Sequence, residues 1–130
     1  MNRPIERCYW VVPGRLLAGE YPRNEEEASS REKVGAFLRA GVAAFIDLTQ
    51  ERELAPYATW IGEAAHHRFP IRDGSIPTSV DAVMTTLDTI DGYVERDQLV
   101  YVHCWGGVGR TGSPETEAQA RYVSRWEAGR

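Results

Sequence analysis

The chain has 130 residues, the length of one domain, so we expect a single domain over residues 1–130 and no separate cofactor module. The apolar share of 42% and the charged share of 26% are typical of soluble globular proteins. With 19 acidic and 15 basic residues the net charge is −4, which argues against nucleic acid or a membrane as a partner. The N-terminal residues contain no apolar signal segment, so we expect a cytoplasmic protein.

Cysteine and histidine positions bear on metals and redox chemistry. Cys8 and Cys104 are too few for a disulfide framework, and neither has a second Cys or His at zinc-ligand spacing. His66 and His67 alternate between the faces of a predicted strand, without a carboxylate or Cys at ligand spacing. We therefore expect no metal site and no cofactor, interpret Cys8 as a core residue, and keep Cys104 as a thiol with a chemical role.

Apolar runs and turn residues predict alternating strands and helices. Strands are expected at 8–12 and 16–18, joined as an edge hairpin by Pro13-Gly14, and then at 42–46, 66–71 and 99–102. A helix through 30–40 follows acidic residues and ends at Gly41, a short helix lies within 56–65, and a last helix begins at Ser113. The best helix opens with a capping box at 78–81, and its apolar stripe consists of Val80, Val83, Met84, Leu87, Ile90 and Val94. This alternation predicts an α/β fold with a mostly parallel sheet flanked by helices.

The loop after the last predicted strand carries the chemistry. Ligands bind α/β sheets beyond the carboxyl ends of the strands, and a glycine-rich turn there can direct several backbone N–H groups at one anion. Such surroundings lower the pKa of a thiol to about 3.5–7.5, which makes Cys104 a candidate nucleophile. Arg110 can hold two oxygens of a phosphoryl group through its planar fork. The expected phosphate-binding loop consists of Trp105, Gly106, Gly107, Val108, Gly109 and Arg110.

His103-Cys104-x-x-Gly107-x-x-Arg110-Thr111 resembles the HCxxGxxR[ST] signature of the cysteine-dependent protein-tyrosine and dual-specificity phosphatases. Every fixed position of that signature is present. Looser similarity extends over residues 14–19, 45–48 and 69–73. The resemblance implies a phosphatase fold, a cysteinyl-phosphate intermediate and a phosphorylated protein or small phosphomonoester as substrate, with no metal. The absence of the tyrosine-specific Trp-Pro-Asp sequence places the likeness nearer to small dual-specificity enzymes.

The resemblance also implies roles for the residues around the nucleophile. Asp73, which stands 31 residues before Cys104, matches the general acid. It would protonate the leaving oxygen and then activate water against the thiophosphate. His103 would orient the loop and support the thiolate, and Thr111 would stabilise the sulfur as it leaves. Asp73 precedes a glycine and could instead be a turn residue, and Asp47, at the end of a predicted strand, is interpreted as a structural cap.

The match breaks after Arg110, where only 20 residues remain and the relatives usually continue through a buried helix. Residues 113–126 resemble the closing segment of bacterial relatives, as if an internal piece were missing. Either the helix of residues 113–126 replaces the missing one, or apolar surface stays open on the 80–94 helix and the strand containing Val100. We favour the second case, which predicts self-association or weak catalysis. The alternatives to a phosphatase are a weakened phosphatase-fold module that binds phosphate without efficient turnover, and a rhodanese-type sulfurtransferase, which the Gly107 and Arg110 spacing disfavours.

Overall fold

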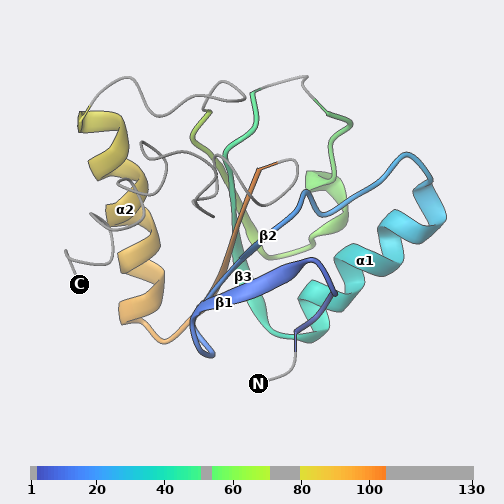
Figure 1. Cartoon of the computed structure of the whole chain (residues 1–130), viewed down its shortest axis with the longest axis horizontal. Helices are drawn as coiled ribbons and strands as arrows, with labels where there is room; N and C mark the ends of the chain where they lie inside the picture. The colour runs from blue at the N-terminus through green and yellow to red at the C-terminus, as the bar shows by residue number, and fades with distance from the viewer. Residues whose placement is uncertain (1–2, 51–53, 71–79, 105–130) are drawn as a thin grey trace.

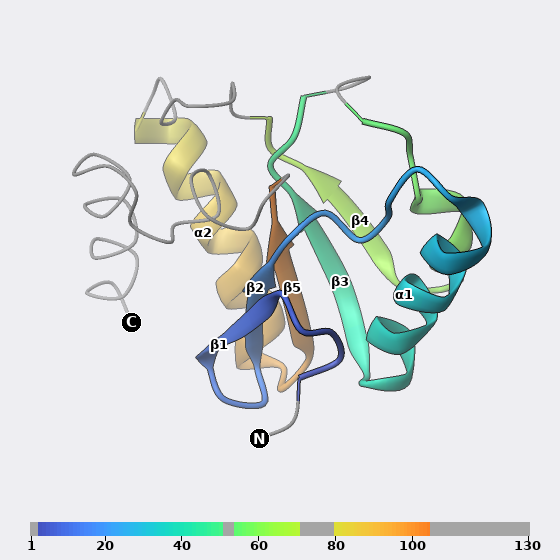
Figure 2. The same cartoon turned by 45° about the vertical axis from the view of Figure 1, so that its right-hand side comes forward.

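A computed structural model of the chain describes residues 3–50, 54–70 and 80–104, with side chains described from residue 84 onward in the last range. Its elements follow the order β1 (Cys8–Val12), β2 (Leu16–Gly19), α1 (Glu27–Arg39), β3 (Val42–Asp47), the 3-10 turn η1 (Ala58–Trp60), β4 (Ala65–Arg68), α2 (Val80–Glu95) and β5 (Leu99–His103). Figure 1 shows the whole chain. The strands form one sheet with the order β1-β2-β5-β3-β4 (Figure 2). β1 pairs antiparallel with β2, and every other pairing is parallel, which confirms the predicted fold class.

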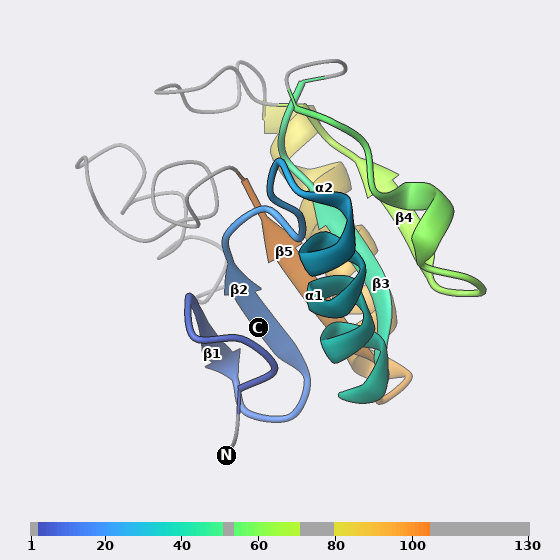
Figure 3. The ribbon, with the colours of Figure 1, turned by 90° about the vertical axis from the view of Figure 1, so that its right-hand side faces the viewer.

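The two helices cover opposite faces of the sheet (Figure 3). Strand residues alternate between the faces, because successive side chains of a strand point in opposite directions. On the α1 face Leu17, Phe45 and Tyr101 pack with Val34 and Phe37 of the helix, and we call this group the α1-side cluster. On the α2 face the α2-side cluster consists of Leu16, Ala44, Ile46, Leu48, Leu87, Ile90, Val94, Val100, Val102 and Cys104.

The predicted opening of the α2 face is wrong for the described residues. Val100 is completely buried, and Leu87, Ile90 and Val94 are 8% exposed or less, because they pack against each other in the α2-side cluster. Met84 departs from the predicted stripe: it is 43% exposed and is the one exposed large apolar side chain in the described part of the chain. Self-association remains a prediction, without the open surface of α2 and β5 as its cause.

Element boundaries differ most from the predictions in residues 56–71. The short helix expected within 56–65 is only the 3-10 turn Ala58–Trp60. The strand expected at 66–71 ends at Arg68, and Pro70, which lacks an N–H group, cannot continue a ladder of hydrogen bonds. Residues 78 and 79 of the predicted capping box and the helix expected from Ser113 lie outside the described residues. Within the described ranges, no helix is both long and apolar enough to span a bilayer.

Candidate active site

The carboxyl ends of four parallel strands meet at one edge of the sheet. In the strand register His103 of β5 lies opposite both Gly19 of β2 and Asp47 of β3, and Asp47 lies opposite Arg68 of β4. Cys104 is the first residue after β5 and is 3% exposed. The predicted nucleophile is thus at the edge where α/β proteins bind their ligands.

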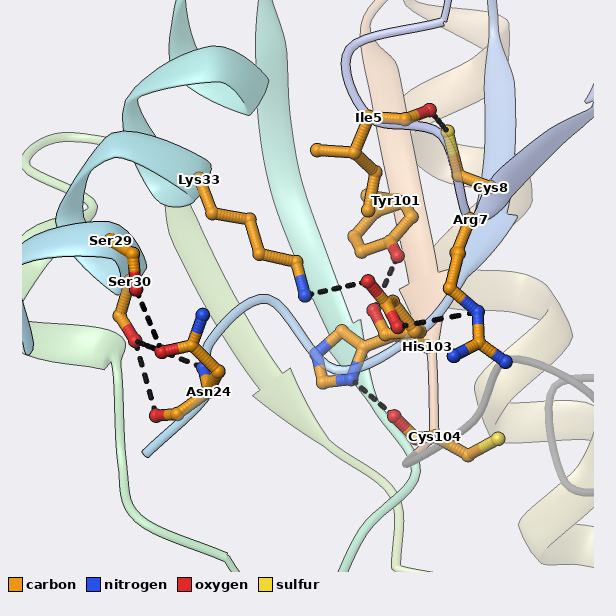
Figure 4. Close-up of polar contacts among 11 residues, drawn as sticks. Ile5, Arg7, Cys8, Asn24, Ser29, Ser30, Lys33, Tyr101, His103 and Cys104 are labelled. Carbon is orange, nitrogen blue, oxygen red and sulfur yellow. Dashed lines mark hydrogen bonds and ion pairs between the residues drawn. The ribbon is translucent and has the colours of Figure 1, made fainter. Parts of the chain in front are cut away.

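His103 is completely buried beside Cys104, and both of its ring nitrogens have partners. Nε2 faces the hydroxyl of Tyr57. Figure 4 shows the other ring nitrogen, Nδ1, which lies 3.3 Å from the backbone oxygen of Cys104. Burial is the main cause that lowers the pKa of His103 to about 4, although the nearby carboxylate of Asp47 opposes the shift. The ring is therefore neutral near pH 7. Of the two neutral forms, only the one protonated at Nδ1 can donate to the Cys104 oxygen and accept from Tyr57.

Tyr57 is a site residue that the sequence analysis missed. Its side chain is 1% exposed, and burial raises the pKa of its phenol far above the ordinary value, with the carboxylate of Asp47 adding to the shift. The phenol therefore stays protonated, and its hydroxyl donates a hydrogen bond to Nε2 of His103. No spacing rule could have found this contact, because the partners are 46 residues apart and Tyr57 lies in an irregular segment.

The end of β2 is in close contact with the strand that carries Cys104. The hydroxyl of Tyr101 on β5 donates to the backbone oxygen of Glu20. A Cβ atom on Gly19 would lie 2.6 Å from the backbone oxygen of Arg7 and 2.7 Å from the Tyr101 hydroxyl, so only glycine fits. The carboxylate of Glu20 pairs with Lys33, whose side chain reaches from α1 at an N–O distance of 2.7 Å (Figure 4).

Asp47 holds the ends of β3 and β4 together through a completely buried carboxylate. One oxygen accepts hydrogen bonds from the Thr49 N–H at 2.9 Å and the Thr49 hydroxyl at 2.5 Å, and the other accepts from His66 at 2.9 Å and Arg68 at 3.1 Å. Burial alone would raise the pKa of Asp47, but these bonds from His66 and Thr49 and the effect of His103 outweigh it and hold the pKa well below the ordinary value. The interpretation of Asp47 as a structural cap is confirmed.

The two cysteines belong to different environments. Cys8 is 3% exposed and packs with the α1-side cluster, and its thiol donates to the backbone oxygen of Ile5, so its interpretation as a core residue is confirmed. Cys104 belongs to the α2-side cluster, on the other face of the sheet. Figure 4 shows its side chain directed away from the His103 ring. In the described ranges, no group of three or more His, Cys, Asp or Glu side chains is placed to hold a metal ion.

The remaining predicted site residues lie outside the described residues. They are Asp73, the loop residues Trp105, Gly106, Gly107, Val108, Gly109 and Arg110, and Thr111. Of the predicted catalytic set, the structure thus places His103 and Cys104 next to each other at the carboxyl end of β5. The roles of all of these residues in catalysis stay predictions.

Comparisons with known proteins identify the family. Residues 5–114 match PTP-SAK, the DSP-PTPase phosphatase domain of Swiss Army Knife proteins. The chain is 32% identical over 119 residues to 067L of Invertebrate iridescent virus 3, and 32% identical over 104 residues to 197R of Invertebrate iridescent virus 6, two proteins named as tyrosine phosphatases. These matches cover 83% and 75% of this chain, and 43% and 36% of the viral proteins.

Solved phosphatase structures have the same fold. A mutant form of Tk-PTP has a TM-score of 0.69 at 19% identity, with 95% of each chain covered. TpbA from P. aeruginosa, in a complex with pTyr, has a TM-score of 0.63 at 16% identity, with 95% of this chain and 75% of that chain covered. PTPMT1, in a complex with PI(5)P, has a TM-score of 0.65 at 16% identity, with 95% and 83% covered.

This chain belongs to the dual-specificity and tyrosine phosphatase domain family. It spans about two fifths of the length of the viral relatives that it matches. The family membership agrees with the resemblance of residues 103–111 to the phosphatase signature.

Proposed function

We propose that the chain is a cysteine-dependent phosphomonoesterase that hydrolyses phosphotyrosine in proteins, with phosphoserine and phosphothreonine as further substrates. The observation that carries the proposal is the position of Cys104 at the carboxyl end of buried β5, directly before the residues that complete the phosphatase signature. Membership of the phosphatase family supports it. The cytoplasmic location expected from the sequence stays a prediction.

The proposed reaction has two steps. In the first, the Cys104 thiolate attacks phosphorus, the bond from phosphorus to the leaving oxygen breaks, and Asp73 gives its proton to that oxygen. In the second, Asp73 takes a proton from water, the hydroxide attacks phosphorus, and the bond from phosphorus to sulfur breaks to release phosphate. Arg110 holds the phosphoryl oxygens in both steps, and Thr111 donates a hydrogen bond to the departing sulfur. No step requires a metal.

The chain's own residues favour a phosphoprotein over a highly charged phospholipid head group. Residues 105–109 carry no charged side chain, so the loop supplies no additional cation for a second phosphate. TpbA was solved in complex with pTyr and PTPMT1 in complex with PI(5)P, so proteins of this fold bind both kinds of ligand. We expect phosphotyrosyl peptides to be hydrolysed faster than PI(5)P.

Turnover of an aryl phosphate in the presence of a chelator tests the proposed function. We expect steady release of the phenol by the unsubstituted chain, and none by Cys104→Ser, because a serine hydroxyl stays protonated near pH 7. Cys104→Ser should still bind tungstate, because the groups that hold the oxyanion are unchanged. Tungstate binding without turnover by the unsubstituted chain would contradict the proposal and support the binding module instead.

A further inference from the structure

Two side chains from the loop after β2 hold the backbone that leads into Tyr57. The hydroxyl of Tyr21 donates to the backbone oxygen of Ala55 at 2.5 Å, and the guanidinium of Arg23 donates to the backbone oxygen of Pro56 at 2.9 Å. Ala55 and Pro56 are exposed and belong to no helix or strand. Since their own side chains contribute little packing, these two hydrogen bonds fix the path of the chain just before Tyr57.

The position of the Tyr57 hydroxyl follows from that path. Tyr57 is buried, and its ring meets the ring of Tyr21 edge to face with the centroids 5.3 Å apart. The Tyr21 ring also contacts the His103 ring, with the centroids 5.4 Å apart. A shift of the Tyr57 backbone would therefore move its hydroxyl away from Nε2 of His103.

Arg23 is itself held in a defined orientation. Its guanidinium lies over the ring of Trp60, 4.7 Å from the centroid, and its Nε donates to the backbone oxygen of Asn24 at 3.1 Å. Arg31 of α1 also lies over Trp60, at 5.1 Å, but its side chain bonds to Glu27. The two arginines thus share the aromatic contact, and Arg23 adds the bond to the segment before Tyr57.

We propose that Tyr21 and Arg23 are positioning residues of the active site, which act through Tyr57 and His103 on Cys104. This inference rests on the proposed function, in which Cys104 reacts as a thiolate. Neutral His103 has a single N–H group, and it points at the Cys104 backbone oxygen only while Nε2 accepts from Tyr57. If the Tyr57 hydroxyl moves, the ring can turn or exchange its proton between nitrogens, and the backbone at Cys104 loses its donor.

The test follows the alkylation of Cys104 by iodoacetamide over a range of pH in the full 130-residue chain. Mass spectrometry of the peptide that contains Cys104 separates this reaction from that of Cys8. We expect Tyr21→Phe and Arg23→Gln each to raise the pH midpoint of alkylation by about half a unit to one unit, the size of one weakened hydrogen bond. Both variants should also lower kcat more than they change KM. Arg23→Lys keeps one donor for Pro56 and should lie between Arg23→Gln and the unsubstituted chain.

Arg31→Gln is the matched control, because it removes the other guanidinium over Trp60 and leaves the bonds to Ala55 and Pro56 intact. Its midpoint should equal that of the unsubstituted chain. Unchanged midpoints in Tyr21→Phe and Arg23→Gln would overturn the inference. A midpoint in Arg31→Gln that rises as much as in Arg23→Gln would overturn the role of Arg23, because the loss of either guanidinium over Trp60 would then have the same effect. A midpoint in the unsubstituted chain equal to that of free cysteine, about 8.5, would instead contradict the proposed function.

Discussion

At the scale of single residues, the general acid is the role that kinetics can test most directly. We expect Asp73→Asn to lower the rate on alkyl phosphates by about 10²–10⁴ and the rate on aryl phosphates with good leaving groups by less, because a stable leaving anion does not need the proton. The measurement is kcat/KM over a series of phosphate esters whose alcohols differ in acidity. An equal loss across the series would mean that Asp73 only shapes the turn before Gly74.

Asp47 gives a prediction for stability and its pH dependence. Its pKa is lower in the fold than the unfolded value of about 3.9, so its stabilising effect is complete above that value and is lost as the pH falls through the folded pKa. Asp47→Asn removes this effect and leaves Arg68 without its carboxylate partner. We expect the variant to lose about 3–5 kcal/mol of unfolding free energy at pH 7, and less at pH 2.5.

Urea unfolding at both pH values measures the difference for Asp47→Asn. Glu27→Gln is the matched control, since it breaks an ion pair with Arg31 whose two side chains are 63% and 60% exposed. Exposed pairs contribute little, so this control should stay close to the unsubstituted chain. A loss for Asp47→Asn that is the same at pH 7 and pH 2.5 would show that the charge of Asp47 contributes nothing.

At the scale of elements, the contact between the β1–β2 hairpin and β5 depends on Gly19. Gly19→Ala should lower the free energy of unfolding by about 1–3 kcal/mol, because the added methyl group meets backbone and the Tyr101 hydroxyl at 2.6–2.7 Å. Gly92→Ala in α2 is the control: nothing lies within 4 Å of its Cβ position, so it should stabilise the chain by about 0.8–1.0 kcal/mol. Chemical unfolding of both variants measures these changes in unfolding free energy. A Gly19→Ala variant as stable as the unsubstituted chain would contradict the tight contact.

The elements also show what sequence patterns can and cannot reveal. The unbroken apolar runs that became β3 and β5 predicted buried parallel strands correctly, because a strand covered on both faces needs apolar residues at successive positions. From these strands the position of Cys104 at the carboxyl edge followed directly. The contacts of His103 with Tyr57 and of Asp47 with His66 could not be predicted, because they depend on how irregular segments fold back over the sheet. Met84 fits the helical period of the apolar stripe and is nevertheless exposed. The period identifies the apolar face of a helix, but it does not show how far along the helix the rest of the protein covers that face.

At the scale of the whole molecule, the described residues offer little surface for self-association. Stable protein interfaces bury about 1,200–2,000 Å² in total, and in the described ranges Met84 is the one large apolar side chain that is exposed. We therefore expect Met84→Gln to have the same sedimentation coefficient as the unsubstituted chain at every concentration over a hundredfold range. Leu87→Gln, three residues further along α2, places a polar amide in the α2-side cluster and should instead lower the thermal unfolding midpoint. If the unsubstituted chain forms an oligomer and Met84→Gln is a monomer, the exposed side of α2 is an interface between copies, which would contradict this expectation.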